Sequence, residues 1–179
     1  MASEIAESGA AARRQLTANA APTARLAADL RARKLSFAVT IARGSSDHAA
    51  LYLKHVVELK AALACASLGP SLASLYHAPL RLAGAVAIAI SQSGRSPDIV
   101  AMQRAARGQG AVTIAMVNDE DSPLARDAYA LLPLHAGAER SVAATKSMIA
   151  SLVAGVCLVG SEMCIRDRIA TAPARRSGA

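Results

Sequence analysis

Aromatic residues are almost absent from this sequence. Its 179 residues include no Trp, three Tyr and a single Phe, Phe37. So few aromatic side chains argue against a stacking surface for single-stranded nucleic acid. They also leave the core to Ala, Leu, Val and Ile, which suits the close packing of helices on a sheet in an α/β fold. The length favours one domain with a proper core over two domains of ordinary size.

Cysteines are few and irregularly spaced. They are odd in number and lack CxxC or Cys/His metal-ligand spacing, so they indicate free thiols in a reducing compartment: Cys65, Cys157 and Cys164. The first residues contain Glu4 and Glu7 and no apolar run, which argues against a secretory signal. No uncharged stretch is long and unbroken enough to span a membrane. We therefore expect a cytoplasmic protein with no membrane partner.

Common catalytic and metal-binding motifs are also missing. There is no Walker loop, no GxGxxG and no Ser/His/Asp arrangement, which argues against nucleotide hydrolysis, dinucleotide binding and acyl transfer. The histidines have no metal-ligand spacing: His48, His55, His77 and His135. We expect no metal and no cofactor. His48 stands out only because it lies close to Ser46.

The positive charge is concentrated near the two ends of the sequence. The formal net charge is +7, but the central segment is nearly balanced. Many of the basic residues lie outside that segment: Arg13, Arg14, Arg25, Arg31, Arg33, Lys34, Arg166, Arg168, Arg175 and Arg176. This distribution favours a solvated helix face and a basic tail over a nucleic-acid groove.

Short apolar runs alternate with segments of helical periodicity. Strands are expected at 35–42, 85–90, 111–117 and 129–134, with a further short strand at 72–75, and helices at about 10–33, 48–66, 97–109 and 144–160. Pro22 divides the first helical segment into two short helices or bends a single one. Alternation of this kind predicts a three-layer α/β/α sandwich around a five-stranded parallel sheet.

Two of the expected strands end in turns rich in small hydroxyl residues. Ser91-Gln92-Ser93-Gly94 follows one of them and leads to Ser96-Pro97, where Ser96 is expected at the N-cap and Pro97 at the first helical position. Arg43-Gly44-Ser45-Ser46-Asp47 repeats the design. Free N–H groups and the positive end of a helix dipole, joined by Ser hydroxyls, suit an anion. The same features also fit a capped helix that binds nothing.

The loop at 136–143 is expected to join these turns, because ligands in open α/β sheets bind beyond the carboxyl ends of the strands. In this loop Glu139 is either a hydrogen-bond acceptor or acid–base group for a sugar, or an acid favoured by the dipole of the next helix. Lys146 is either a cation of the site or a solvated surface residue. Both alternatives stay open for each residue.

Three segments together resemble the sugar isomerase (SIS) domain family of phosphosugar isomerases and phosphosugar-binding regulators. They are Arg43-Gly44-Ser45-Ser46-Asp47, Ser91-Gln92-Ser93-Gly94-Arg95-Ser96, and the segment from Gly137 to Ser147 that opens the last helix. Their order and spacing agree over about residues 35–160. The chain is most similar to the first SIS domain of isomerising glucosamine-6-phosphate synthases and of glucosamine-6-phosphate deaminases without a glutaminase domain.

The resemblance implies a flavodoxin-like SIS domain over 35–160, an N-terminal helical segment at 1–34, and an atypical tail at 161–179 that is disordered or comes from a misread reading frame. It implies a hexose 6-phosphate ligand, fructose 6-phosphate or glucosamine 6-phosphate. The implied phosphate contacts are Ser91, Gln92, Ser93 and Ser96, and the implied sugar contacts are Ser45, Ser46 and Val142. Gly44 and Lys146 complete the expected ligand-binding residues.

The sequence departs from the family pattern at two points. Ala144 stands where the synthases have Ser. The family enzymes also have a second SIS domain and a tail that supply the catalytic Glu, Lys and His, and this sequence stops before them. We therefore expect ligand binding without turnover, with Glu139 as the one candidate catalytic residue. An unpaired half should expose apolar surface that a homodimer would cover.

Two other functions compete with this N-terminal half of a phosphosugar isomerase, aminotransferase or deaminase. One is a non-catalytic phosphosugar sensor. Sensors of that kind carry an upstream helix-turn-helix region, and about 34 residues before the first strand are too few for one. The other is an α/β interaction module that binds no ligand.

Overall fold

A five-stranded parallel sheet forms the centre of the protein. The computed structural model describes residues 1–140 and 144–160. Strands β1 (Phe37–Ile41), β2 (Cys65–Leu68), β3 (Ala85–Ser91), β4 (Val112–Val117) and β5 (Ala130–Pro133) lie in the order β2-β1-β3-β4-β5. Every residue of β3 is buried, because this strand has a neighbour on each side and helices on each face.

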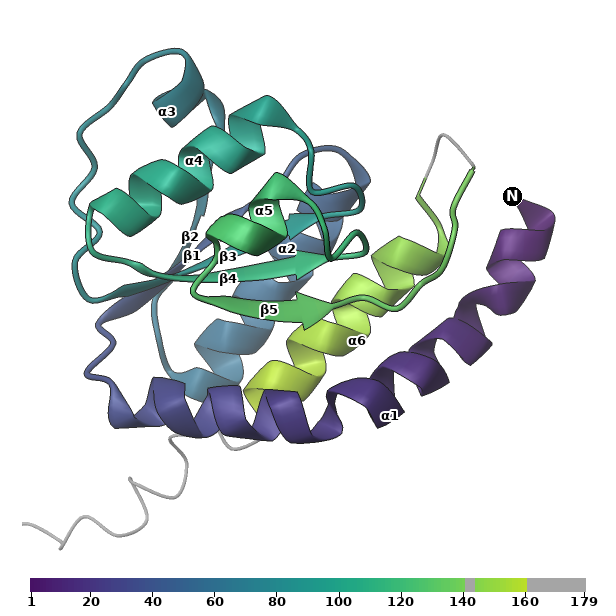
Figure 1. Ribbon diagram of the computed structural model, residues 1–179. Coiled ribbons are helices and arrows are strands. Elements are labelled where there is room, and N and C mark those ends of the chain that lie inside the picture. Colours follow the sequence, from purple (N-terminus) through teal and green to yellow (C-terminus); the bar gives the residue numbers. More distant parts are fainter. Residues whose placement is uncertain (141–143, 161–179) are drawn as a thin grey trace, which may run out of the picture.

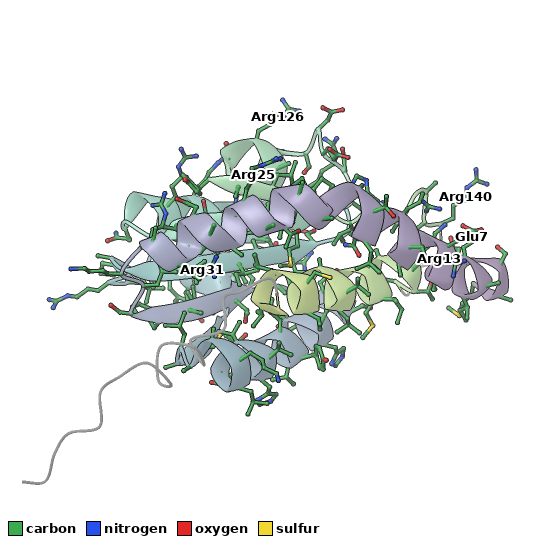
Figure 2. All side chains as sticks on the ribbon, turned by 90° about the horizontal axis from the view of Figure 1, so that it is seen from below. Glu7, Arg13, Arg25, Arg31, Arg126 and Arg140 are labelled. Carbon is green, nitrogen blue, oxygen red and sulfur yellow. The ribbon has the colours of Figure 1, made fainter. Side chains whose placement is uncertain are left out.

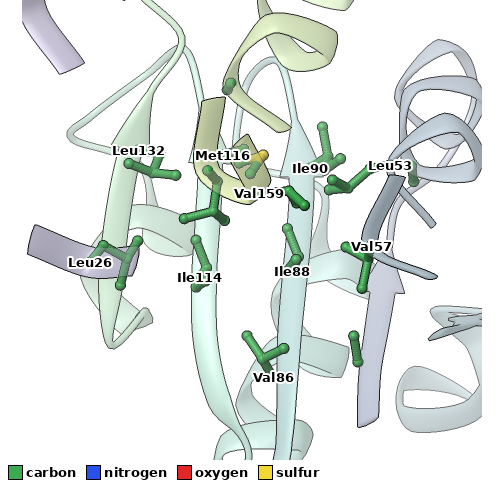
Figure 3. Packing of buried hydrophobic residues seen from close by; sticks show 14 of the residues in the cluster. Leu26, Leu53, Val57, Val86, Ile88, Ile90, Ile114, Met116, Leu132 and Val159 are labelled. Carbon is green, nitrogen blue, oxygen red and sulfur yellow. The ribbon is translucent and has the colours of Figure 1, made fainter. Parts of the chain in front are cut away.

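Helices cover both faces of the sheet (Figure 1). One face carries α1 (Ala2–Ala32), α2 (Ser45–Val56) and α6 (Lys146–Gly160), and the other carries α3 (Ser71–Ser74), α4 (Pro97–Gly108) and α5 (Pro123–Asp127). Each face has its own apolar cluster. Figure 3 shows the first cluster, in which Ile88 and Ile114 of the sheet lie among Leu53 of α2 and Val159 of α6. The predicted three-layer α/β/α sandwich with a parallel sheet is confirmed.

The N-terminal segment forms one helix, α1, and not two. It begins at Ala2, earlier than expected, and Pro22 lies inside it, where the missing N–H interrupts the hydrogen-bond ladder. Leu26 and Leu30 of α1 belong to the same apolar cluster as β3 and α6. Figure 2 shows α1 alongside α6, and Arg25 and Arg31 are exposed on it. The N-terminal segment is therefore part of the core of the domain.

The second strand lies at Cys65–Leu68, so the prediction of a strand at 72–75 is wrong. Residues 71–74 form the short helix α3 instead. The predicted helix at 48–66 is too long: α2 ends at Val56 and a π-helical turn, η1 (Val57–Ala61), follows it. The chain then reverses at Ala62, which has a φ of 52°. Glycine is the usual residue in that conformation, so the sequence carried no signal for the end of the helix.

Two further expectations concern the membrane and the C-terminal tail. Across residues 1–140 and 144–160, the structure contains no helix that is both long and apolar enough to cross a bilayer. The expected atypical tail at 161–179 lies outside the described residues.

Candidate functional site

The strand order reverses between β1 and β3, because β1 leads into α2 on one face of the sheet and β3 leads into α4 on the other. Such a reversal opens a crevice at the carboxyl ends of the two strands. A cavity of about 220 Å³ lies there, and we call it the serine cradle. Its lining residues are Arg43, Ser45, Ser46, Ser91, Gln92, Ser93, Ser96, Ile99, Glu139 and Ala144.

The cavity brings together residues from all three segments singled out in the sequence. The predicted ligand contacts Ser45, Ser46, Ser91, Gln92, Ser93 and Ser96 line it, as does the candidate catalytic Glu139. Gly44 lies beside them as the N-cap of α2. Val142 lies outside the described residues. Lys146 lines a different cavity. The three segments thus meet at the predicted edge of the sheet.

The turn between β3 and α4 is held by its own serine side chains. Ser91 is buried, with 5% of the residue exposed. Its Oγ accepts a hydrogen bond from the N–H of Gly94 at 3.0 Å. The Oγ of Ser93 accepts one from the N–H of Arg95 at 3.3 Å. In both cases the hydroxyl oxygen is the acceptor, so the O–H is still able to donate to a ligand. Shaping the turn and binding an anion, alternatives in the sequence, are compatible roles for these serines.

Gly94 is required by the close packing of this turn. Its φ is +62°, and a methyl group added there would lie 2.2 Å from Oγ of Ser122 and 2.7 Å from Cγ2 of Val117. Its carbonyl oxygen accepts a hydrogen bond from the N–H of Leu124. Gly94 belongs to the Ser91-Gln92-Ser93-Gly94 motif but was not predicted to have a role of its own. Its contact with the loop after β4 fixes the position of the two serines beside it.

Two helices of 12 residues each begin at the cavity. Gly44 precedes α2 with a φ of 60° and a ψ of −135°, a conformation that glycine adopts easily and other residues do not. Ser96 is the N-cap of α4 and Pro97 its first residue, so the prediction of these positions is confirmed. In the described structure the Ser96 side chain makes no capping hydrogen bond. Residues in the first turn of each helix line the cavity, so the positive ends of both helix dipoles face it.

Glu139 is bound to the start of α6. Thr145 donates to its Oε1 through the backbone N–H at 2.7 Å and through the hydroxyl at 3.0 Å, and the Ser147 hydroxyl donates to Oε2. Partial burial raises the pKa of Glu139, but the hydrogen bonds from Ser147 and Thr145 outweigh it and hold the pKa below its ordinary value. The geometry thus favours a carboxylate that positions the loop beside the cavity, and its role as an acid–base group stays a prediction.

Lys146 lies away from the serine cradle. It is 3% exposed, and its Nζ is 2.5 Å from Oε2 of Glu7 on α1. It lines a separate cavity together with residues of α1 and of the 136–140 loop. Because Glu7 already neutralises its charge, Lys146 ties α1 to α6 in this structure. Its assignment as a ligand contact stays a prediction.

Arg43 lines the cavity but was not among the predicted ligand contacts. It follows β1 after Ala42, and its Nη1 is 2.9 Å from Oδ2 of Asp98 in the first turn of α4. Its Nη2 lies 3.5 Å from Oγ of Ser96. A basic residue directly before Gly44 was the available signal, but the pairing with a residue 55 positions away was not visible in the sequence.

Comparison with known proteins gives a consistent family match. Residues 30–160 match the SIS domain family. The isomerizing glutamine–fructose-6-phosphate aminotransferase of Streptomyces coelicolor is 36% identical over 124 residues, which are 68% of this chain and 20% of the relative. The corresponding enzyme of Bradyrhizobium diazoefficiens is 41% identical over 117 residues, which are 65% of this chain and 19% of the relative.

Solved structures show the same similarity. A candidate phosphosugar isomerase from Silicibacter pomeroyi has a TM-score of 0.86 and 51% identity, with 89% of this chain and 49% of that chain covered. The C-terminal domain of glucosamine-fructose-6-phosphate aminotransferase from Francisella tularensis has a TM-score of 0.77 and 24% identity, with 95% and 50% covered, which supports the fold alone. The chain spans about a fifth of the length of the curated relatives and about half of these solved chains.

Proposed function

Because the chain belongs to the SIS-domain family, we propose that it binds a hexose 6-phosphate in the serine cradle. One observation carries this proposal: the two serine-rich turns and Glu139 line a single cavity where two helices begin. Hydroxyl groups, helix N–H groups and the Gln92 amide are donors of the kind that an anionic phosphate needs.

The proposed orientation places the phosphate at Ser91, Gln92, Ser93 and Ser96, and the sugar at Ser45, Ser46 and Val142. The turn after β3 suits the phosphate, because Ser91 and Ser93 are held in place by backbone contacts before any ligand arrives. The volume of about 220 Å³ is small beside the roughly 300–1,000 Å³ of most ligand pockets. A single phosphorylated sugar fits that size better than a nucleotide does.

The wider activity is proposed from the relatives. The match to isomerizing glutamine–fructose-6-phosphate aminotransferases supports fructose 6-phosphate and glucosamine 6-phosphate as ligands. We propose that the chain corresponds to the first SIS half of an aldose–ketose phosphosugar isomerase, aminotransferase or deaminase. By itself it binds the sugar phosphate without turnover, since the family places its catalytic Glu, Lys and His in a second SIS domain and tail.

Titration calorimetry of the 179-residue chain with fructose 6-phosphate and glucosamine 6-phosphate tests the binding proposal. We expect saturable heat with either ester and none with unphosphorylated glucosamine. Ser93→Ala should weaken binding about tenfold, as expected for the loss of one hydrogen bond to a charged group. Ser74→Ala on the surface of α3 is the matched control and should bind as the parent does. Equal affinity of the two variants, or no heat from the parent, would contradict the proposal.

A coupled assay for isomerisation or deamination tests the second part. We expect no turnover from this chain at ligand concentrations that saturate binding. Turnover at rates typical of enzymes would show that the catalytic groups lie within the 179 residues, and Glu139 would then be the first residue to replace.

We also propose that the protein forms a homodimer. Neighbouring helices α2 and α6 expose large apolar side chains: Leu51, Tyr52, Ile149 and Val156. Burying such a surface against a second copy would remove it from water. Sedimentation equilibrium should give a dimer mass, and a monomer mass at high protein concentration would contradict this proposal.

A further inference from the structure

The serine cradle contains one cationic side chain among its described lining residues, Arg43. This side chain is 62% exposed and projects from the last turn before α2. Its backbone therefore belongs to one of the two turns that form the cavity. Its guanidinium reaches the other turn, where it contacts Asp98 and Ser96.

The guanidinium of Arg43 has donors to spare. An Arg side chain carries five N–H groups in a planar fork. Nη1 donates to Oδ2 of Asp98 at 2.9 Å, and Nη2 lies at the outer limit of a hydrogen bond, 3.5 Å, from Oγ of Ser96. The N–H groups not used in these two contacts are available to oxygens in the cavity. The contact with Ser96 places them beside a residue proposed above to bind the phosphate.

The charge balance of the cavity favours such a contact. Glu139, the one carboxylate among the described lining residues, carries a depressed pKa and is therefore ionised at neutral pH. A phosphate dianion entering beside it meets like charge, which costs free energy unless a cation is close. The two helix N-termini supply partial positive charge, and Arg43 adds a guanidinium that Asp98 contacts on one side only.

Asp98 anchors Arg43 without closing the site. Its Oδ1 accepts a hydrogen bond from the N–H of Ile99 at 3.0 Å, so the carboxylate is fixed at the start of α4, and only Oδ2 binds Arg43. A guanidinium held on one side keeps less rotamer freedom, and less entropy is then lost when it binds a ligand.

We propose that Arg43 is the charged phosphate contact of the serine cradle and that Asp98 holds its guanidinium at the cavity. This inference rests on the proposed function, since it assumes that the cavity takes a phosphate ester. It adds a residue of the first family segment that was not among the ligand contacts implied by the resemblance. It also makes affinity depend on charge in addition to hydroxyl hydrogen bonds.

Replacement of Arg43 tests this assignment directly. Calorimetry with glucosamine 6-phosphate compares the parent with Arg43→Gln, Arg43→Lys and Arg95→Gln. Arg95 is the matched control because it lies in the turn after β3, is 57% exposed and pairs with Asp119 outside the cavity. Arg43→Gln and Arg95→Gln remove the same charge, so the comparison separates a local contact from the overall field of the protein.

We expect Arg43→Gln to weaken binding about tenfold or more and Arg95→Gln by less than about twofold. Arg43→Lys should fall between the parent and Arg43→Gln, because it keeps the charge and loses the planar fork. The affinity of the parent should also fall more steeply with added NaCl than that of Arg43→Gln. Thermal melts of the unliganded variants, expected to match the parent because Arg43 is exposed, show that each is folded.

The outcomes separate this inference from the proposed function. If Ser93→Ala loses affinity and Arg43→Gln does not, the inference is overturned and the proposed function stands. If Arg43→Gln and Arg95→Gln lose affinity equally, the effect is long-range and the inference is again overturned. If the folded parent gives no heat with the ester, both are overturned.

Discussion

The two strand-to-helix turns of the serine cradle have similar sequences but are held very differently. The turn after β3 is packed against the loop that follows β4, and its serines bond to its own backbone. The turn after β1 is open: within the described structure, a methyl group added to Gly44 would have no atom within 4 Å outside its immediate neighbours. One turn is preorganised and the other has space to adjust.

This difference fits the two parts of the proposed ligand. A phosphate group presents the same charged oxygens whichever sugar carries it, so a preorganised turn lowers the entropy lost on binding it. The sugar differs in its hydroxyl and amino groups from one ligand to the next. Space around Gly44 lets the first turn adapt to them.

Gly94→Ala is expected to have the largest effect. The added methyl group would overlap Ser122 and Val117, and the positive φ would be strained as well. Overpacking and backbone strain together should lower the free energy of unfolding by about 3 kcal/mol or more. Urea denaturation followed by circular dichroism measures this, and ligand binding should be lost. A fully stable variant would show that the turn after β3 is not rigidly packed.

Gly44→Ala tests the conclusion that the turn after β1 is open. Its backbone conformation is strained for alanine, but the methyl group meets no neighbour, so the loss should be about 1–2 kcal/mol. The same urea titration checks the value. A loss as large as that of Gly94→Ala would contradict the conclusion that this turn is open.

Ser91→Ala and Ser46→Ala compare the stability contributed by a serine in the packed turn and in the open turn. Ser91→Ala removes the acceptor of the buried hydrogen bond from Gly94 and should cost about 1 kcal/mol of unfolding free energy. Ser46→Ala in the open turn should leave stability within about 0.5 kcal/mol of the parent, as is usual for partly exposed sites. Both variants should bind the phosphosugar more weakly. Equal stability of the two variants would remove the distinction between the turns.

Glu139 gives a small expected effect on stability, and this effect depends on pH. The pKa of Glu139 is lower in the folded protein than in the unfolded chain, so its contribution to stability is complete above the unfolded pKa of about 4.3 and is lost as pH falls through the folded pKa. Glu139→Gln should cost about 0.5–1 kcal/mol at pH 7. Urea titrations at pH 7 and pH 3 should show the difference between variant and parent shrinking at the lower pH. A constant difference would contradict this assignment.

The sequence was a good guide to the central strands and a poor one to the second strand. The apolar runs that became β3 and β4 stand out because both faces of these strands are buried. β2 is an edge strand, and two of its four residues are exposed, so it carries little apolar signal. The reversal at Ala62 also lacks the glycine that usually marks it.

The candidate site was predicted in outline. The hydroxyl residues of both turns and Glu139 were expected to meet, because the carboxyl ends of parallel strands lie at one edge, and they line one cavity. The partners of the charged residues were not predicted. Arg43 lines the cavity and contacts Asp98. Lys146 lines a different cavity and contacts Glu7, which is 139 residues distant in the sequence.

The sequence by itself determined the elements that depend on near neighbours: the strands of the sheet centre, the proline and serine that start α4, and the small residues of the turns. These follow from backbone hydrogen bonding and sterics over a few residues. The packing of distant segments sets which charged side chains face the cavity. It also leaves no space for a side chain at Gly94. Those outcomes depend on side chains from distant parts of the chain, whose positions are fixed only when the sheet and its helices pack together.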